Sequence, residues 1–296
     1  MDAHILLLGV DGGGTSCRAR LRSVSGELLG EAATGPANLR LGLEQSFSAL
    51  MDAATQALNH AGLSSQHLAR VVACLALAGA SEPTYLAAAR DYPHPFRKAV
   101  VVTDAHAACL GAHGPRDGGV VVAGTGTVGW AVVRGQTYRV GGWGLPISDE
   151  GSGAWLGSEA LRRVLWALDG RLAWTGLLRT LAADFGNDPH FIVRWADTAS
   201  PRDFGSLAPR IFDYATRGDA VAVELAELAA RHIDALAARL IGVGAARLAL
   251  VGGCAPFLQN FVAATTKSHL IEPAGDALEG SLQVARAAAQ SLARVA

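Results

Sequence analysis

The chain has 296 residues, 50% of them hydrophobic, and a formal net charge of −1. This length and apolar content can fill one large core or two of medium size, and the length favours two domains. The near-neutral charge gives no basic surface for nucleic acid. Glycine, proline and polar residues interrupt the long uncharged runs, which argues against a membrane segment. Since the chain enters its first predicted strand without a targeting segment, we expect a cytoplasmic protein.

A glycine-rich hairpin is predicted at the start of the chain. Residues 4–8, beginning with His4, form an apolar run typical of a buried strand, and the sequence GVDGGGT follows from Gly9. Residues 17–24 then alternate between apolar and polar side chains, which indicates a second strand. No lysine follows the glycines and no helix begins there, so neither a P-loop nor a dinucleotide fingerprint fits. Backbone N–H groups in such a turn can bind an anion, and an ordinary hairpin turn is the simpler alternative.

The rest of the first half alternates strands with helices. Strands are predicted over residues 28–33, 71–78 and 99–102, the first of them after a turn at Gly26. Helices are predicted over residues 43–61, 83–90 and 105–112. Three antiparallel strands followed by strands with helical crossovers are typical of a mixed sheet in the α/β class.

The second half restarts the same plan. Strands are predicted over residues 118–123 and 128–133, on either side of a glycine and threonine turn, and a third strand begins at Arg247 and ends in Gly252 and Gly253. Helices are predicted over residues 153–168, within 174–240, and over 279–295. A stripe at helical spacing predicts core packing; it consists of Val221, Leu225, Leu228, His232, Leu236 and Leu240.

The four cysteines lie in apolar stretches without Cys-x-x-Cys spacing. This setting predicts small buried side chains rather than disulfides or metal ligands. They are Cys17, Cys74, Cys109 and Cys254.

Two half-domains that each open with a glycine-rich hairpin, and a late Gly-Gly turn, resemble the superfamily of actin, the heat-shock chaperones and the sugar kinases. The resemblance implies an α/β fold of two actin-like (ribonuclease H-like) domains, with mixed sheets flanked by helices and an ATP cleft between them. We expect one lobe at residues 1–113 with 281–296 packed back on it, and a second at 114–280. The implied phosphate contacts are Gly13, Gly14, Thr15, Gly124, Thr125, Gly126 and Thr127, and the implied adenosine contacts are Gly252 and Gly253.

Several segments narrow the resemblance, namely GVDGGGT, GPAN, TDAHAACLGA, AGTGTVGW, GGWGLPISDEGSGAWLG and LVGGCAPF. They are similar to the family of N-acetylglucosamine kinases and glucosamine kinases, whose relatives include ATPase activators of acyl-CoA reductases and dehydratases. The likeness implies sugar contacts at Asn38, Asp104, Gly142, Trp143, Asp149 and Gly153. Ser148 stands where this family often has glycine.

Each candidate side chain has a structural alternative. Asp104 follows a predicted strand, so it could accept the proton of a sugar hydroxyl during phosphoryl transfer, or cap the next helix. Asp11 lies beside the first turn, where it could hold Mg²⁺ directly or through water, or bond within the turn. Asp149 could instead cap the helix at 153–168. Trp143, between glycines, could be a core residue or a wall against the sugar, and the flanking glycines favour an exposed loop.

We therefore predict an ATP-dependent and Mg²⁺-dependent kinase, a homodimer, that phosphorylates N-acetylglucosamine or glucosamine at O6. One alternative is an ATPase activator with an iron–sulfur cluster, which needs cysteines at a subunit seam. Another is a non-catalytic sugar sensor built on a kinase fold. The cysteines in predicted strands and helices argue against the first alternative, and the presence of Asp104 argues against the second.

Overall fold

The computed structural model describes residues 5–295. Its contacts divide the chain into two compact units, Met1–Val120 with Glu272–Ala296, and Val121–Ile271. The chain thus passes from one unit to the other twice. Within residues 5–295, no helix has both the length and the apolar character needed to cross a bilayer.

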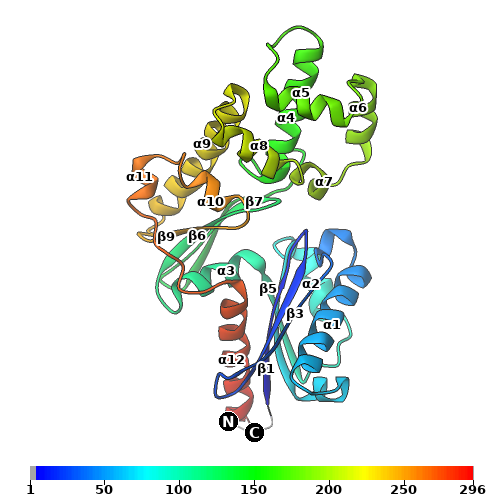
Figure 1. Cartoon of the computed structure of the whole chain (residues 1–296). Helices are drawn as coiled ribbons and strands as arrows, with labels where there is room; N and C mark the ends of the chain where they lie inside the picture. The colour runs from blue at the N-terminus through cyan, green and yellow to red at the C-terminus, as the bar shows by residue number, and fades with distance from the viewer. Residues whose placement is uncertain (1–4, 296) are drawn as a thin grey trace. The chain divides into compact units, whose positions relative to one another are not determined.

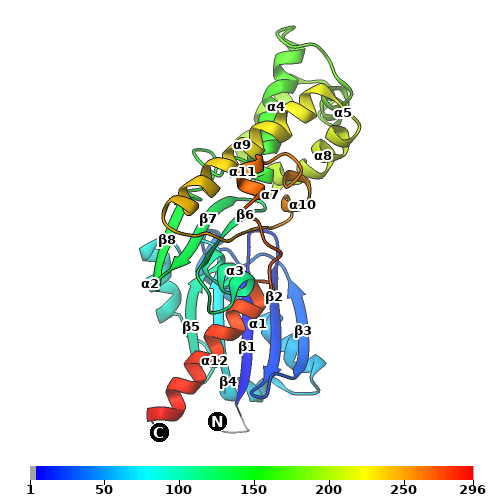
Figure 2. The same ribbon diagram turned by 90° about the vertical axis from the view of Figure 1, so that its left-hand side faces the viewer.

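The first unit contains a five-stranded mixed sheet in the order β3-β2-β1-β4-β5, which can be followed in Figures 1 and 2 together. Its strands are β1 (Leu6–Gly12), β2 (Cys17–Ser23), β3 (Leu28–Thr34), β4 (Val71–Leu77) and β5 (Lys98–Thr103). β2 runs antiparallel to β1 and β3, whereas β1, β4 and β5 run parallel. This arrangement confirms the predicted mixed sheet.

The first strand is longer than predicted. β1 continues to Gly12 because each residue from Gly9 onward pairs with β2, down to Gly12 opposite Cys17. The turn is therefore confined to residues 13–16. His4, predicted to begin this strand, lies outside the described residues.

Helices cover both faces of this sheet (Figures 1 and 2). One face packs on α1 (Leu43–His60) and α2 (Pro83–Asp91), with the short η1 (Leu39–Leu41) and η2 (Ser65–Arg70) nearby. The other face packs on α3 (Asp104–His113) and α12 (Ala277–Val295). Because both faces are covered, the uninterrupted apolar run of β4 is fully buried.

The second sheet has the order β8-β7-β6-β9, which repeats the order β3-β2-β1-β4 of the first. Its strands are β6 (Gly118–Ala123), β7 (Thr127–Val133), β8 (Gln136–Gly141) and β9 (Leu248–Val251). The repeated order confirms the predicted duplication. β8 was not predicted from the sequence, since its residues are only half-buried or exposed and lack an apolar alternation.

The predicted helical region of the second unit resolves into separate helices. The helices are α4 (Gly153–Leu168), α5 (Gly176–Asp184), α6 (Pro189–Thr198), α7 (Pro201–Gly205), α8 (Ala208–Thr216), α9 (Ala220–Gly242), α10 (Ala255–Leu258) and α11 (Ala264–Lys267). The predicted stripe on α9 is displaced from the true core face. Leu228, His232 and Leu236 are only half-buried, because the face centres on small residues such as Ala226 and Ala229 that allow close packing.

Candidate active site

Three parallel strands of the first unit end at one edge of its sheet. Gly12 pairs with Leu77 and Leu77 pairs with Thr103, so β1, β4 and β5 end level with one another. The first glycine turn and Asp104 therefore emerge at the same edge. Open α/β sheets characteristically bind ligands at the carboxyl ends of their parallel strands.

The glycines of the first turn fall into two kinds. A Cβ on Gly12 would lie 2.9 Å from the backbone atom Ala37 O and 2.7 Å from Leu77 Cδ2, so the packing of the protein itself requires glycine there. A Cβ on Gly13 would meet nothing closer than 3.5 Å, and one on Gly14 nothing closer than 3.9 Å, and neither has a positive φ. Gly242, at the end of α9, is also a glycine with open space around it. Open space at a glycine therefore indicates a ligand site only where the glycine lies at a place that binds ligands. At this edge, the open glycines fit the close approach of a ligand to the backbone.

The GPAN loop is fastened to the first turn. The Ala37 N–H donates to Gly13 O at 3.1 Å, and Asn38 Oδ1 accepts from the Arg40 N–H at 3.0 Å, capping η1. The other amide atom, Nδ2, lies 3.9 Å from the position of a Cβ on Gly14. The structure thus brings Asn38 to the turn, with its amide nitrogen beside Gly14.

Asp104 is the first residue of α3, but it is not the N-cap. Thr103 holds that position, and its Oγ1 accepts from the His106 N–H at 3.0 Å. The capping alternative for Asp104 is therefore wrong. Its half-buried carboxylate accepts from the Ala105 N–H at 2.9 Å through Oδ1. Burial lowers the pKa of the neighbouring His106.

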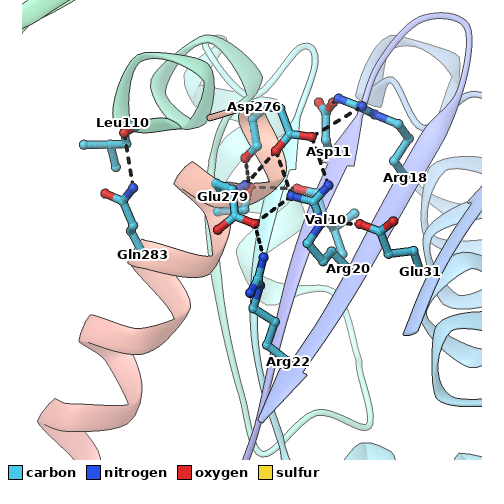
Figure 3. Close-up of polar contacts among 12 residues, drawn as sticks. Val10, Asp11, Arg18, Arg20, Arg22, Glu31, Leu110, Asp276, Glu279 and Gln283 are labelled. Carbon is cyan, nitrogen blue, oxygen red and sulfur yellow. Dashed lines mark hydrogen bonds and ion pairs between the residues drawn. The ribbon is translucent and has the colours of Figure 1, made fainter. Parts of the chain in front are cut away.

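Asp11 forms an ion pair across the first hairpin (Figure 3). It stands opposite Arg18 in the strand register, and its Oδ2 accepts from Arg18 Nη2 at 2.6 Å. This cross-strand pair replaces the turn hydrogen bond considered as the alternative. Within residues 5–295 no cluster of three or more His, Cys, Asp or Glu side chains could hold a metal. Asp11 therefore fits Mg²⁺ only in the sparse manner usual for that ion, with water and phosphate oxygens completing the shell.

The second glycine turn is docked on the start of α4. The Gly153 N–H donates to Gly124 O at 2.8 Å. Gly153 was predicted to contact the sugar, but its N–H group is therefore already bonded to the second glycine turn. A Cβ on Gly124 would meet nothing closer than 4.0 Å, whereas one on Gly126 would lie 2.5 Å from Asp149 Oδ2. Thr127 is 3% exposed and its Oγ1 has no hydrogen-bond partner in the described part of the chain. Gly124, Thr125 and Gly126 are half-buried and therefore more accessible than Thr127.

Asp149 organises the loop before α4. It has a φ of 66°, and its Oδ1 accepts from the Gly144 N–H at 2.9 Å. The capping alternative is wrong here too, because Ser152 caps α4 by accepting from the Trp155 N–H at 3.1 Å. Ser148, at the family's glycine position, is buried and donates to Glu150 Oε2 at 3.2 Å. The loop is therefore held by its own polar side chains.

Trp143 projects from this loop. Its side chain is 66% exposed, which excludes the core alternative, and the Arg139 guanidinium carbon lies 4.0 Å from the ring centroid. Gly142 and Gly144 beside it both have positive φ, so the chain can turn sharply on each side. The arrangement offers an exposed flat ring of the kind that packs on the apolar face of a sugar.

The late glycine turn contains another pair of contrasting glycines. Gly252 has a φ of 101° and a Cβ there would lie 2.5 Å from Ala123 O, whereas a Cβ on Gly253 would meet nothing within 4 Å. Phe257, which was not predicted as a site residue, is 40% exposed and stacks on Phe212 with ring centroids 4.6 Å apart. The sequence feature that could have identified it is an aromatic residue four positions after Gly253. The outer face of this ring is suited to a planar apolar group.

The repeated sheets, with a glycine turn at the start of each, define a protein of two duplicated domains with the actin-like fold. More narrowly, the chain belongs to the BadF/BadG/BcrA/BcrD ATPase family, which its residues 8–271 match.

Comparison with known proteins agrees with this placement. The chain is 41% identical over 278 residues to glucosamine kinase GspK of Vibrio cholerae, covering 94% of this chain and 95% of that protein. It is 26% identical over 236 residues to an N-acetylmuramic acid/N-acetylglucosamine kinase of Clostridium acetobutylicum, covering 77% and 76% respectively. A solved structure of a candidate N-acetylglucosamine kinase from Chromobacterium violaceum superposes with a TM-score of 0.90 at 33% identity, covering 95% of this chain and 99% of that one.

Proposed function

We propose that the protein transfers the γ-phosphoryl group of ATP to O6 of an amino sugar, glucosamine or N-acetylglucosamine, with Asp104 as general base. The observation that carries the proposal is the placement of Asp104 at the same sheet edge as the open glycines Gly13 and Gly14. The 41% identity to a glucosamine kinase supports an amino sugar as the acceptor. The predicted homodimer and cytoplasmic location stay predictions.

The proposed reaction uses few side chains. Asp104 accepts the proton of the sugar hydroxyl as its oxygen bonds to the γ-phosphorus, while the bond from that phosphorus to the β–γ bridging oxygen breaks and ADP leaves. The Gly13 N–H already donates to Ser16 O at 2.9 Å, so the other backbone N–H groups of the first glycine turn would orient phosphate oxygens. In the second unit, the Gly124 N–H likewise donates to Gly126 O at 2.9 Å. Mg²⁺, held by Asp11, would neutralise phosphate charge. Positioning and electrostatics thus supply most of the rate enhancement.

In the first unit, the Asn38 amide nitrogen is the hydrogen-bond donor that we propose for the sugar. In the second unit, the proposed sugar contacts are the Asp149 carboxylate and the exposed ring of Trp143. In the first unit, the fixing of Asn38 by the Arg40 N–H means that this amide need not be ordered when the sugar binds. Preorganised polar groups discriminate strongly against a substrate that leaves them unpaired.

A panel of sugars tested with ATP and Mg²⁺ for ADP release examines the proposal. We expect a higher kcat/KM for glucosamine or N-acetylglucosamine than for glucose. The ratio should stay below the ceiling of about 10⁴ for a missing polar group, since glucose retains a hydroxyl at carbon 2. Asn38→Ala should raise the KM for the sugar and leave that for ATP nearly unchanged.

Ser46→Ala is the matched control, because it removes the bond from Ser46 Oγ to Asn38 O, 2.7 Å long, and keeps the amide. It should alter the sugar KM much less than Asn38→Ala does. Equal kcat/KM values for glucose and both amino sugars would refute the acceptor assignment. So would an Asn38→Ala variant that weakens ATP and sugar alike.

The cysteines bear on the activator alternative. All four are buried and none forms a disulfide, as predicted. Burial raises the pKa of Cys17 and of Cys74 to about 12, and that of Cys254 to about 11. The thiolate is the form that binds iron or reacts, so these side chains are poorly suited to a cluster.

We therefore expect the native protein to resist alkylation by iodoacetamide at pH 8, and the unfolded protein to be modified at all four cysteines. With a thiol pKa of about 12, only about 10⁻⁴ of each such thiol is ionised at that pH. Mass spectrometry of the intact protein measures the outcome. Rapid modification of a native cysteine, or purified protein that carries iron, would favour the activator.

A further inference from the structure

A network of charged side chains lies between β2 and the start of α12, and we call it the charge network (Figure 3). Arginines at alternate positions of β2 face α12, and carboxylates from β1, β3 and α12 surround them. Its members are Asp11, Arg18, Arg20, Arg22, Glu31, Asp276 and Glu279. The proposed function uses Asp11 alone among these residues, so the purpose of the others is open.

The centre of the charge network is fixed. Arg20 donates from Nη1 to Asp276 Oδ1 at 3.0 Å and from Nη2 to Asp276 Oδ2 at 3.2 Å. Its Nη1 also reaches Glu279 Oε1 at 2.8 Å, and the side chain is only 17% exposed. Asp276 in turn accepts from the Glu279 N–H at 3.0 Å, so it also caps the first turn of α12.

Arg18, by contrast, stands between two carboxylates at unequal distances. Its Nη2 lies 2.6 Å from Asp11 Oδ2, and its Nη1 lies 3.7 Å from Asp276 Oδ2. The Arg18 side chain is 44% exposed, more than twice the exposure of Arg20, so it has room to move. A shift of its guanidinium group could exchange the closer partner for the farther one.

The two carboxylates are linked to the same part of the fold. The first turn of α12 lies against β1, where Ser281 Oγ donates to Val10 O at 3.1 Å and a Cβ on Gly9 would lie 2.7 Å from Leu278 O. The chain enters this unit from the other one between Ile271 and Glu272, shortly before Asp276. A change in the partner of Asp11 can therefore alter the first turn of α12 and the segment before it, by which the chain re-enters the unit.

We propose that Arg18 is an exchangeable partner of Asp11, paired with Asp11 when no divalent cation is bound and with Asp276 when one is. The proposal rests on the role of Asp11 in the proposed function. A cation at Asp11 repels the guanidinium group and competes for the same carboxylate, while Asp276 offers Arg18 a second negative charge close by. Asp276 is thus a positioning residue. By pairing with Arg18 it leaves the Asp11 carboxylate to the metal, and because Asp276 caps α12, metal binding affects the first turn of that helix.

Asp276→Asn tests the exchange. Asparagine keeps a side-chain oxygen to cap α12, but it lacks the charge that would receive Arg18. With Mn²⁺ as the probe and ADP present, followed by electron paramagnetic resonance, we expect the variant to bind Mn²⁺ about tenfold more weakly, a change worth about 1.4 kcal/mol. Its affinity for ADP without metal should match that of the unchanged protein.

Hydrogen exchange gives a readout that does not depend on turnover. In the unchanged protein, Mn²⁺ with ADP should slow hydrogen exchange at the Glu279 amide. The Glu279 N–H donates to Asp276, and pairing with Arg18 would fix the Asp276 side chain in the position that accepts this bond. Asp276→Asn should abolish this slowing. Arg22→Gln is the matched control, since Arg22 lies on the same face and pairs with Glu279 but with neither Asp11 nor Asp276. It should preserve both the Mn²⁺ affinity and the slowing.

The outcomes separate this proposal from the proposed function. If Asp276→Asn and Arg22→Gln behave alike, or if Asp11→Asn leaves Mn²⁺ affinity unchanged, the exchange is wrong even where amino sugars are phosphorylated. If the unchanged protein shows the predicted Mn²⁺ and exchange behaviour but phosphorylates no amino sugar, the sugar assignment fails and the exchange stands.

Discussion

Replacing Asp104 with asparagine is expected to lower kcat by about 10² to 10⁴, the usual contribution of a general base. The amide cannot accept the hydroxyl proton, yet its oxygen can still accept from the Ala105 N–H as the carboxylate does. Stability should fall by less than about 1 kcal/mol, the usual value of a negative charge near a helix N-terminus. Steady-state kinetics and urea unfolding of the same preparation measure both effects.

Thr103→Ala is the control that separates catalysis from capping. It removes the hydroxyl that caps α3 and should cost about 1 kcal/mol of unfolding free energy, while the Asp104 carboxylate remains. Its kcat should therefore exceed that of Asp104→Asn by at least tenfold. An Asp104→Asn variant that folds normally and keeps most of its turnover would exclude the general-base role.

The fold was predictable because its patterns are local. The alternation of Cys17 to Ser23 marks a strand, and the apolar run of β4 marks a strand buried on both faces, so both emerge from the sequence. β8 could not be recognised in this way, because its residues are half-buried or exposed and its place depends on pairing with β7. The core face of α9 was misjudged because alanine, which contributes little to a hydrophobic pattern, forms much of it.

The candidate site was predictable at the level of residue types, but not of their partners. The glycine turns can be recognised from the sequence, whereas the ion pair of Asp11 with Arg18 depends on the register of the hairpin. Likewise, the true caps Thr103 and Ser152 precede α3 and α4 by a single residue. Helix boundaries are uncertain by more than that from sequence alone, so the sequence could not decide whether Asp104 and Asp149 cap these helices.

The late turn offers an internal comparison between adjacent glycines. Gly252→Ala should lower the free energy of unfolding by about 2 to 4 kcal/mol, through the cost of a positive φ together with overpacking. The added Cβ would lie 2.5 Å from Ala123 O, a backbone atom at the end of β6 that cannot easily move. Urea unfolding measures the loss.

Gly253→Ala should behave in the opposite way, although it is the neighbouring residue and makes the same chemical change. Its φ is not positive and nothing lies within 4 Å of the added Cβ, so stability should be unchanged or rise by about 0.4 to 1 kcal/mol. If adenosine approaches this backbone, the methyl group obstructs it, and the KM for ATP should rise about tenfold with the sugar KM little changed. Gly242→Ala, at an equally open position at the end of α9, should alter neither KM. A Gly253→Ala enzyme with an unaltered KM for ATP would remove the late turn from the nucleotide site, because no packing constraint would then explain the glycine.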